Sequence, residues 1–125
     1  MDVRDAVEAD AERMAELTDA PMDVMRNLVH DRTVRIAEED EEIVGFVSFD
    51  AQAQTVYVTQ LEGPCETCTE LLAEPIRFAD REGMTVEYLV GEDDDAGREA
   101  AENAGFAEAG YGPRFGSTRT IRYRQ

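Results

Sequence analysis

The sequence predicts a single α/β domain over residues 1–125. Short runs rich in β-branched residues, such as residues 43–49 and 55–61, alternate with longer segments whose apolar residues recur at helical spacing. The length of 125 residues leaves room for one hydrophobic core. No repeat or linker divides the chain, so we expect one folding unit.

The first half should hold an opening strand, two helices and three strands. Residues 2–7 read as the opening strand, and Asp10 suits the N-cap of the helix that follows. Pro21 fits the first position of a second helix. The next three strands are expected over residues 33–37, 43–49 and 55–61, and the continuous apolar run of the middle one indicates burial on both faces.

A long helix is expected over residues 66–82, ending at Gly83. Pro75 lies inside it, removes a backbone hydrogen bond and clashes with the carbonyl of Leu71. We therefore predict a kink or two abutting helices.

The C-terminal part should contain a strand, a helix and a hairpin. The strand covers residues 85–90, and the aspartates at 93–95 cap a helix that ends at Gly105. The hairpin pairs residues 106–111 with 118–124, and Gly112-Pro113 and Gly116 join its strands.

Charge is the strongest global signal. There are 29 acidic residues against 12 basic ones, all arginine, for a formal net charge of −17. The carboxylates of such a surface repel one another in dilute buffer, and concentrated salt screens this repulsion. We therefore expect a halophilic protein. The same charge argues against nucleic-acid binding. No membrane span and no secretory signal is evident, which predicts a cytoplasmic location.

The two cysteines form one pair, Cys65 and Cys68, where a strand meets a helix. This placement can support redox exchange, but the nearby Glu62, Glu66 and Glu70 oppose thiolate formation. One buried and one incidental cysteine is the favoured interpretation. With one histidine and no second cysteine pair, no metal site is expected.

The order of segments resembles that of the GNAT N-acetyltransferase superfamily, of which the chain would be a divergent, haloarchaeal-type member. The resemblance implies a mixed, mostly antiparallel central sheet flanked by helices. It spans the whole chain and is carried by the acidic turn between residues 36–38 and 43–46, Val58, Leu71-Leu72, Gly83 and Gly105-Phe106.

The resemblance implies acetyl-CoA as co-substrate. Its pantetheine arm would lie along a free strand edge, with a backbone N–H at Val58–Thr59 polarising the thioester carbonyl. Its diphosphate would meet the next helix N-terminus. The implied cofactor-binding residues are Val58, Thr59, Gly63, Glu66, Thr67 and Cys68.

Two of the matching positions depart from the family pattern. Glu66 stands where the family has glycine, and Ala101 stands where it has a tyrosine that protonates the leaving thiolate. Tyr57 and Tyr111 are candidates to replace that acid.

Three functions follow from these observations. The first is acyl transfer to an amine of a small molecule or a protein. The second is a binding or regulatory module that has lost catalysis, which the altered Glu66 and Ala101 favour. The third is thiol redox chemistry at the cysteine pair. A homodimer is compatible with all three.

Overall fold

The computed structural model describes residues 1–125, which form one seven-stranded sheet with helices on both faces. The strands are β1 (Asp2–Asp5), β2 (Thr33–Glu39), β3 (Glu42–Gln52), β4 (Thr55–Glu62), β5 (Thr85–Gly91), β6 (Ala107–Phe115) and β7 (Thr118–Arg124). The helices are the 3-10 turn η1 (Glu8–Asp10), α1 (Ala11–Thr18), α2 (Met22–Asp31), α3 (Cys65–Leu71), α4 (Ala73–Glu82) and α5 (Asp95–Asn103).

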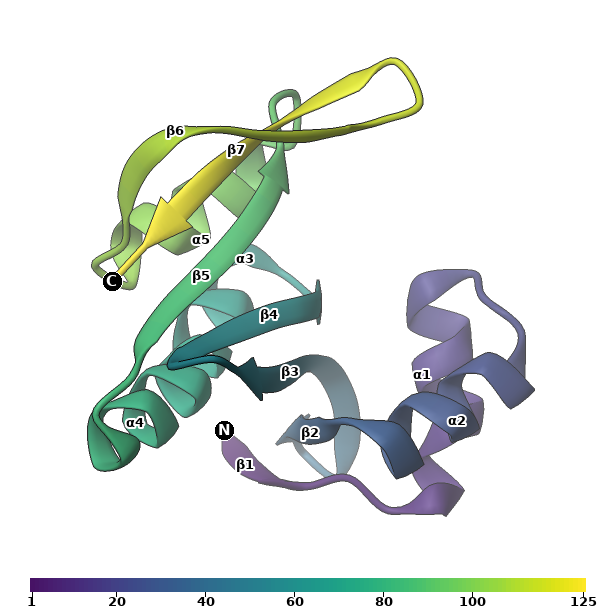
Figure 1. The fold of residues 1–125 in the computed structure, drawn as a ribbon. Helices are drawn as coiled ribbons and strands as arrows, with labels where there is room; N and C mark the ends of the chain where they lie inside the picture. The colour runs from purple at the N-terminus through teal and green to yellow at the C-terminus, as the bar shows by residue number, and fades with distance from the viewer.

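The sheet is mixed and mostly antiparallel, as predicted. Its strand order is β1-β2-β3-β4-β5-β7-β6, and β4 with β5 is the only parallel pair. β3 lies inside the sheet, and residues 45–49 are all buried, which confirms the prediction of burial on both faces. Figure 1 shows β1 to β4 forming one half of the sheet, and β5, β7 and β6 forming the other.

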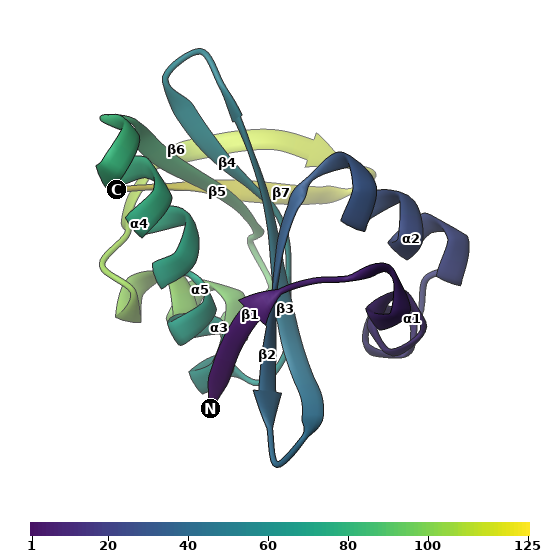
Figure 2. The same ribbon diagram turned by 90° about the horizontal axis from the view of Figure 1, so that it is seen from below.

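Helices cover the two faces unequally. Seen from below, α1 and α2 lie on one side of the sheet, and α3, α4 and α5 lie on the other (Figure 2). The larger core contains buried side chains such as Val47, Leu71 and Tyr123, on the side of α3 to α5. A smaller core, which includes Met14 and Ile36, lies beneath α1 and α2.

Pro75 divides the long helix as its chemistry requires. The helix is interrupted at Leu72 into α3 and α4, so the prediction of two abutting helices is correct. Gly83 ends α4 in the left-handed conformation, with φ of 68°. Asp94 caps α5 by accepting a hydrogen bond from the Gly97 backbone N–H at 3.0 Å.

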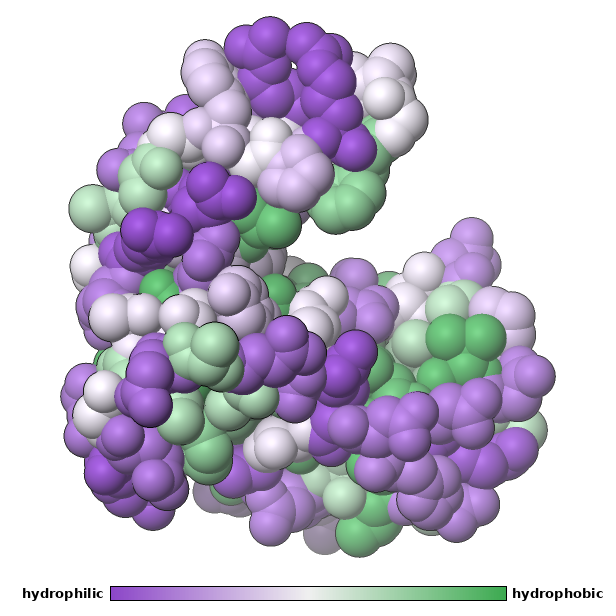
Figure 3. Space-filling view, in the orientation of Figure 1, coloured by the Kyte–Doolittle hydropathy of each residue, from purple (hydrophilic) through white to green (hydrophobic).

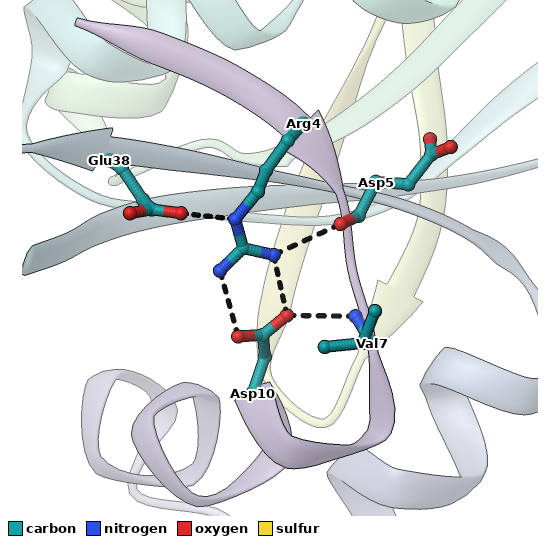
Figure 4. Close-up of polar contacts among 5 residues, drawn as sticks. All are labelled: Arg4, Asp5, Val7, Asp10 and Glu38. Atoms are coloured by element: carbon teal, nitrogen blue, oxygen red, sulfur yellow. Dashed lines mark hydrogen bonds and ion pairs between the residues drawn. The ribbon is translucent and has the colours of Figure 1, made fainter. Parts of the chain in front are cut away.

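Asp10 occupies the N-cap position of α1, as expected, but its side chain makes no capping hydrogen bond to that helix. Asp10 lies in η1 with helical backbone angles, and its carboxylate accepts hydrogen bonds from Arg4 and from the Val7 backbone N–H instead (Figure 4). A bidentate arginine is a stronger partner than one backbone amide. Pro21 also lies one position earlier than expected, as the N-cap of α2.

The last hairpin is longer than expected. Gly112 and Pro113 lie inside β6, which continues to Phe115, and the turn is formed at Gly116. Two register shifts interrupt β6 on either side of Tyr111, so the strand accommodates the proline at an irregular, exposed edge. No helix of the structure is both long and apolar enough to span a membrane.

Candidate active site at the fork between two strands

The parallel strands β4 and β5 form a fork. They pair over four positions only, from Thr55 opposite Thr85 to Val58 opposite Tyr88. Beyond that point the two strands diverge, as Figure 1 shows at their arrowheads. The edge of β4 that faces β5 is therefore free of strand pairing from Thr59 onward, and its backbone groups are open to another extended group.

A β-bulge lies at the base of this fork. Ser48 pairs with Gln60 and Phe49 pairs with Val58, so Thr59 is the extra residue of β4. The bulge is tied to the sheet because the hydroxyls of Thr59 and the fully buried Ser48 are 2.7 Å apart. The bulge changes the direction of the β4 backbone at the point where β4 and β5 separate.

A cavity of about 130 Å³ lies beside the fork on the side of α3 and α5. It is closed by the end of β4, the start of α3, β5 and the start of α5. No arginine is among its lining residues, which are Leu61, Glu62, Gly63, Cys65, Cys68, Tyr88, Asp94, Ala96 and Gly97. The cavity therefore offers carboxylates, thiols and a phenol, but no positive charge.

Tyr88 supplies the phenol of this cavity. It is 8% exposed, lies in the last pair of β5 with β4, and makes no hydrogen bond through its hydroxyl within the protein. Burial, and then the charge of Asp94, raise the pKa of its phenol. The group is thus neutral at physiological pH and able to donate.

Glu62 and Asp94 make the lining of the cavity acidic. Burial raises the pKa of Glu62, and the charge of Asp94 adds to that shift, while a hydrogen bond from Gln60 opposes it. Glu66 is exposed in the first turn of α3. A diphosphate at this helix N-terminus would therefore meet carboxylates rather than the arginine or lysine that usually neutralises it.

Gly63 and Thr67 have a packing role here. Gly63 has φ of 134°, and a Cβ built on it would lie 3.0 Å from the Val44 carbonyl oxygen. A Cβ on Gly45 would lie 2.5 Å from the Glu62 carbonyl oxygen. The loop after β4 thus crosses β3 so closely that a side chain at Gly45 or Gly63 would crowd the backbone of the other segment. The buried Thr67 side chain packs against this crossing, not into the cavity.

Both cysteines line the cavity as free thiols. Cys68 is 6% exposed, and its Sγ lies 3.3 Å from the Gly63 carbonyl oxygen. Burial, with Glu62 nearby, raises the pKa of Cys68 to about 12. Partial burial and Glu99 raise the pKa of Cys65. These shifts disfavour the thiolates that redox exchange needs, which agrees with one buried and one partly exposed cysteine.

The three positions considered for the proton donor differ widely in burial and in orientation. Ala101 is fully buried in the large core, so a tyrosine there would overpack it. Tyr57 precedes Val58 on β4 and points to the opposite face, where it is 36% exposed. Tyr111 is 62% exposed on β6, with the Arg119 guanidinium 4.5 Å from its ring centre. The sequence candidates therefore do not come together around the cavity.

A second opening lies across the sheet from the cavity. Figure 3 shows a hollow between the lobe formed by the β6–β7 hairpin and the one formed by α1 and α2, and the tips of β4 and β5 open toward it (Figure 1). A second reactant that enters this hollow could therefore reach a ligand lying in the fork. No group of three or more His, Cys, Asp and Glu side chains is close enough to hold a metal ion.

Comparison with known proteins identifies the fold. The sequence matches no protein-family model and no curated protein significantly. The structure, however, superposes on ribosomal-protein-alanine N-acetyltransferase from Brucella melitensis with a TM-score of 0.83 and 16% identity, over 100% of this chain and 99% of the other.

Two further structures agree with it. A Desulfovibrio desulfuricans protein of the GNAT family has a TM-score of 0.78 and 21% identity, with 99% of this chain and 97% of the other covered. YncA from Salmonella typhimurium, solved with its cofactor acetyl-CoA, has a TM-score of 0.79 and 18% identity, with 99% and 91% covered. The chain therefore has the GNAT acetyltransferase fold, as the segment order predicted.

Proposed function

We propose that the protein is a divergent GNAT-type acyltransferase that moves an acyl group from acetyl-CoA, or a related thioester, to an amine at the fork between β4 and β5. The observation that carries this proposal is the bulge at Thr59, where β4 stops pairing with β5. An extended pantetheine arm can pair with the free edge of β4, as an added strand would.

The chemistry assigned to the fork is simple. The amine nitrogen attacks the thioester carbonyl carbon, and the developing oxyanion is stabilised by a backbone N–H at Val58–Thr59. The donor enters on the side of α3 and α5, and the amine of a small molecule or protein enters from the hollow on the other face. Because the two reactants meet inside the sheet, water is displaced from the reacting atoms.

The diphosphate end of the donor fits less well. Glu62, Glu66 and Asp94 surround the place where the helix N-terminus would receive it, and Pro64 has no N–H to offer. We therefore expect weak affinity for acetyl-CoA in dilute buffer and tighter binding where salt screens these carboxylates. A salt-rich cytoplasm would provide that condition.

The test is amine-dependent release of CoA thiol, in molar salt, over a panel of primary amines and peptide N-termini. Thr59→Pro removes the backbone N–H at the bulge, and the matched Thr59→Ala keeps it. We expect transfer by the unmodified protein and by Thr59→Ala, and loss of transfer in Thr59→Pro with circular dichroism unchanged. Thioester hydrolysis without amine is the blank.

A non-catalytic binding module is the second candidate, favoured by Ala101 and by the acidic cavity lining. It predicts acetyl-CoA binding without amine-dependent thiol release from any donor. That result, obtained with folded protein, would replace the acyltransferase proposal.

A further inference from the structure

Tyr88 occupies a particular place in the fork. It is the last residue of β5 that still pairs with β4, opposite Val58, and its side chain turns toward the cavity beside α3 and α5. The strands separate directly after this pair. A thioester threaded along the free edge of β4 would therefore pass beside its ring.

The cross-strand neighbour of Tyr88 shows what an ordinary buried tyrosine does in this sheet. Tyr123 lies opposite Tyr88 in β7 and is fully buried. Its hydroxyl accepts a hydrogen bond from the Arg98 Nε at 3.2 Å and donates to the Glu102 carboxylate at 3.1 Å. Tyr88 is almost as deeply buried, yet its hydroxyl has no protein partner. No side-chain polar atom of the protein is both fully buried and unpartnered, so the Tyr88 hydroxyl is accessible from the cavity, where a ligand can accept its hydrogen bond.

We propose, on the basis of the acyl transfer proposed above, that Tyr88 is the catalytic acid that hydrogen-bonds to the thioester sulfur and protonates it as it leaves. Tyr88 on β5 would thus supply the proton that position 101 cannot supply, because Ala101 ends in a buried methyl group.

The proton balance of this step is closed. The amine nitrogen forms its bond to the carbonyl carbon, and the carbon–sulfur bond breaks with its electron pair going to sulfur. The Tyr88 hydroxyl proton passes to that sulfur, which gives the free thiol. The proton that the nitrogen sheds returns to the phenolate through water, so the products are an amide, a thiol and an unchanged tyrosine.

The other tyrosines are less well placed for this role. Tyr57 lies on the same strand pair but points to the opposite face of the sheet. Tyr111 lies on β6, two strands from β5 in the sheet order, where it stacks against Arg119. Neither lines the cavity.

The experiment compares Tyr88→Phe with Tyr123→Phe, a matched loss of a buried phenol hydroxyl from the same face. The turnover number is measured with acetyl-CoA and with an acetyl aryl thioester, whose leaving thiolate needs no protonation. Acetyl-CoA affinity is measured by calorimetry at the same molar salt. Circular dichroism at the assay temperature checks that both variants are folded.

We expect Tyr88→Phe to lower turnover with acetyl-CoA by about 100-fold or more, with affinity unchanged and with most of the loss absent for the aryl thioester. Tyr123→Phe should keep its turnover. Turnover by Tyr88→Phe within a few-fold of the unmodified protein, or an equal loss with both donors, would overturn the role of Tyr88 and leave the proposed transfer intact. No transfer by the unmodified protein from either donor would overturn both.

Discussion

Two polar regions of this protein differ in whether their buried polar groups have hydrogen-bond partners within the chain. At the corner where β1 meets η1, every buried charge has partners (Figure 4). Asp10 is 7% exposed, and its carboxylate accepts hydrogen bonds from two Arg4 nitrogens at 2.8 and 2.9 Å and from the Val7 backbone N–H at 2.8 Å. Glu38 completes the set by binding Arg4 from β2.

At the fork, by contrast, a largely buried side chain has a polar group with no partner in the protein. Tyr88 has a free hydroxyl, and the pKa of Glu62 is raised because the carboxylate is buried near Asp94. The corner fixes the path of the chain between β1 and α1. The fork keeps a polar cavity in which the Tyr88 hydroxyl remains available, which is the property expected of a ligand site.

The largest expected effect on both regions comes from salt. With a net charge of −17, lowering salt from molar to dilute should destabilise the whole fold, because unscreened repulsion favours expansion. Circular dichroism and thermal unfolding across a potassium chloride series measure this. The corner opposes the trend, since salt weakens ion pairs. Equal or greater stability in dilute buffer would show that such partnered charges outweigh the acidic surface.

Asp10→Asn should give the next largest effect. Arg4 holds the pKa of Asp10 below its usual range, so Asp10 adds stability above the unfolded pKa that is lost as the pH falls through the folded one. Because Arg4 is 39% exposed, we expect a modest cost of about 1–3 kcal/mol at neutral pH. Urea unfolding measures it.

The control is Asp5→Asn. Asp5 is 79% exposed where it pairs with Arg35, and its loss should change stability by less than about 0.5 kcal/mol. Equal costs for the two variants, or a cost for Asp10→Asn that persists well below pH 4, would contradict the contrast between buried and exposed pairs.

Glu62→Gln should have the smallest effect and the opposite sign. A carboxylate whose pKa is raised in the folded state favours folding below its unfolded pKa, and this advantage is lost as the pH rises through the folded value. The neutral amide should therefore stabilise the protein by up to about 1 kcal/mol at neutral pH and not in acid. The exposed Glu66→Gln is the control. A loss of stability in Glu62→Gln at neutral pH would mean that the hydrogen bond from Gln60 outweighs the cost of burying the charge.

The sequence was most informative where structure depends on neighbouring residues. Pro75 broke the helix and Gly83 ended it, because both effects act through the backbone within one turn. The order of segments was enough to indicate the fold. Asp10 lies at the predicted N-cap position, but its carboxylate does not cap α1, because its partner Arg4 comes from another element.

The candidate site was only partly predictable for the same reason. The free edge that begins after Val58, at Thr59, follows from the fold, whereas the role of Thr67 depends on the crossing of Gly63 over β3. Tyr88 was missed because an aromatic residue in a strand pattern is an ordinary core residue. Only the three-dimensional structure shows that its hydroxyl lacks a partner.

Hydrogen–deuterium exchange with and without acetyl-CoA, in molar salt, tests the central claim most directly, since it locates the ligand without requiring turnover. We expect acetyl-CoA to slow exchange at the backbone amides of residues 59–62, where β4 no longer pairs with β5, while the corner amides of residues 4–10 stay unchanged. Protection confined to other segments, or absent at saturating acetyl-CoA, would contradict a thioester site at the fork.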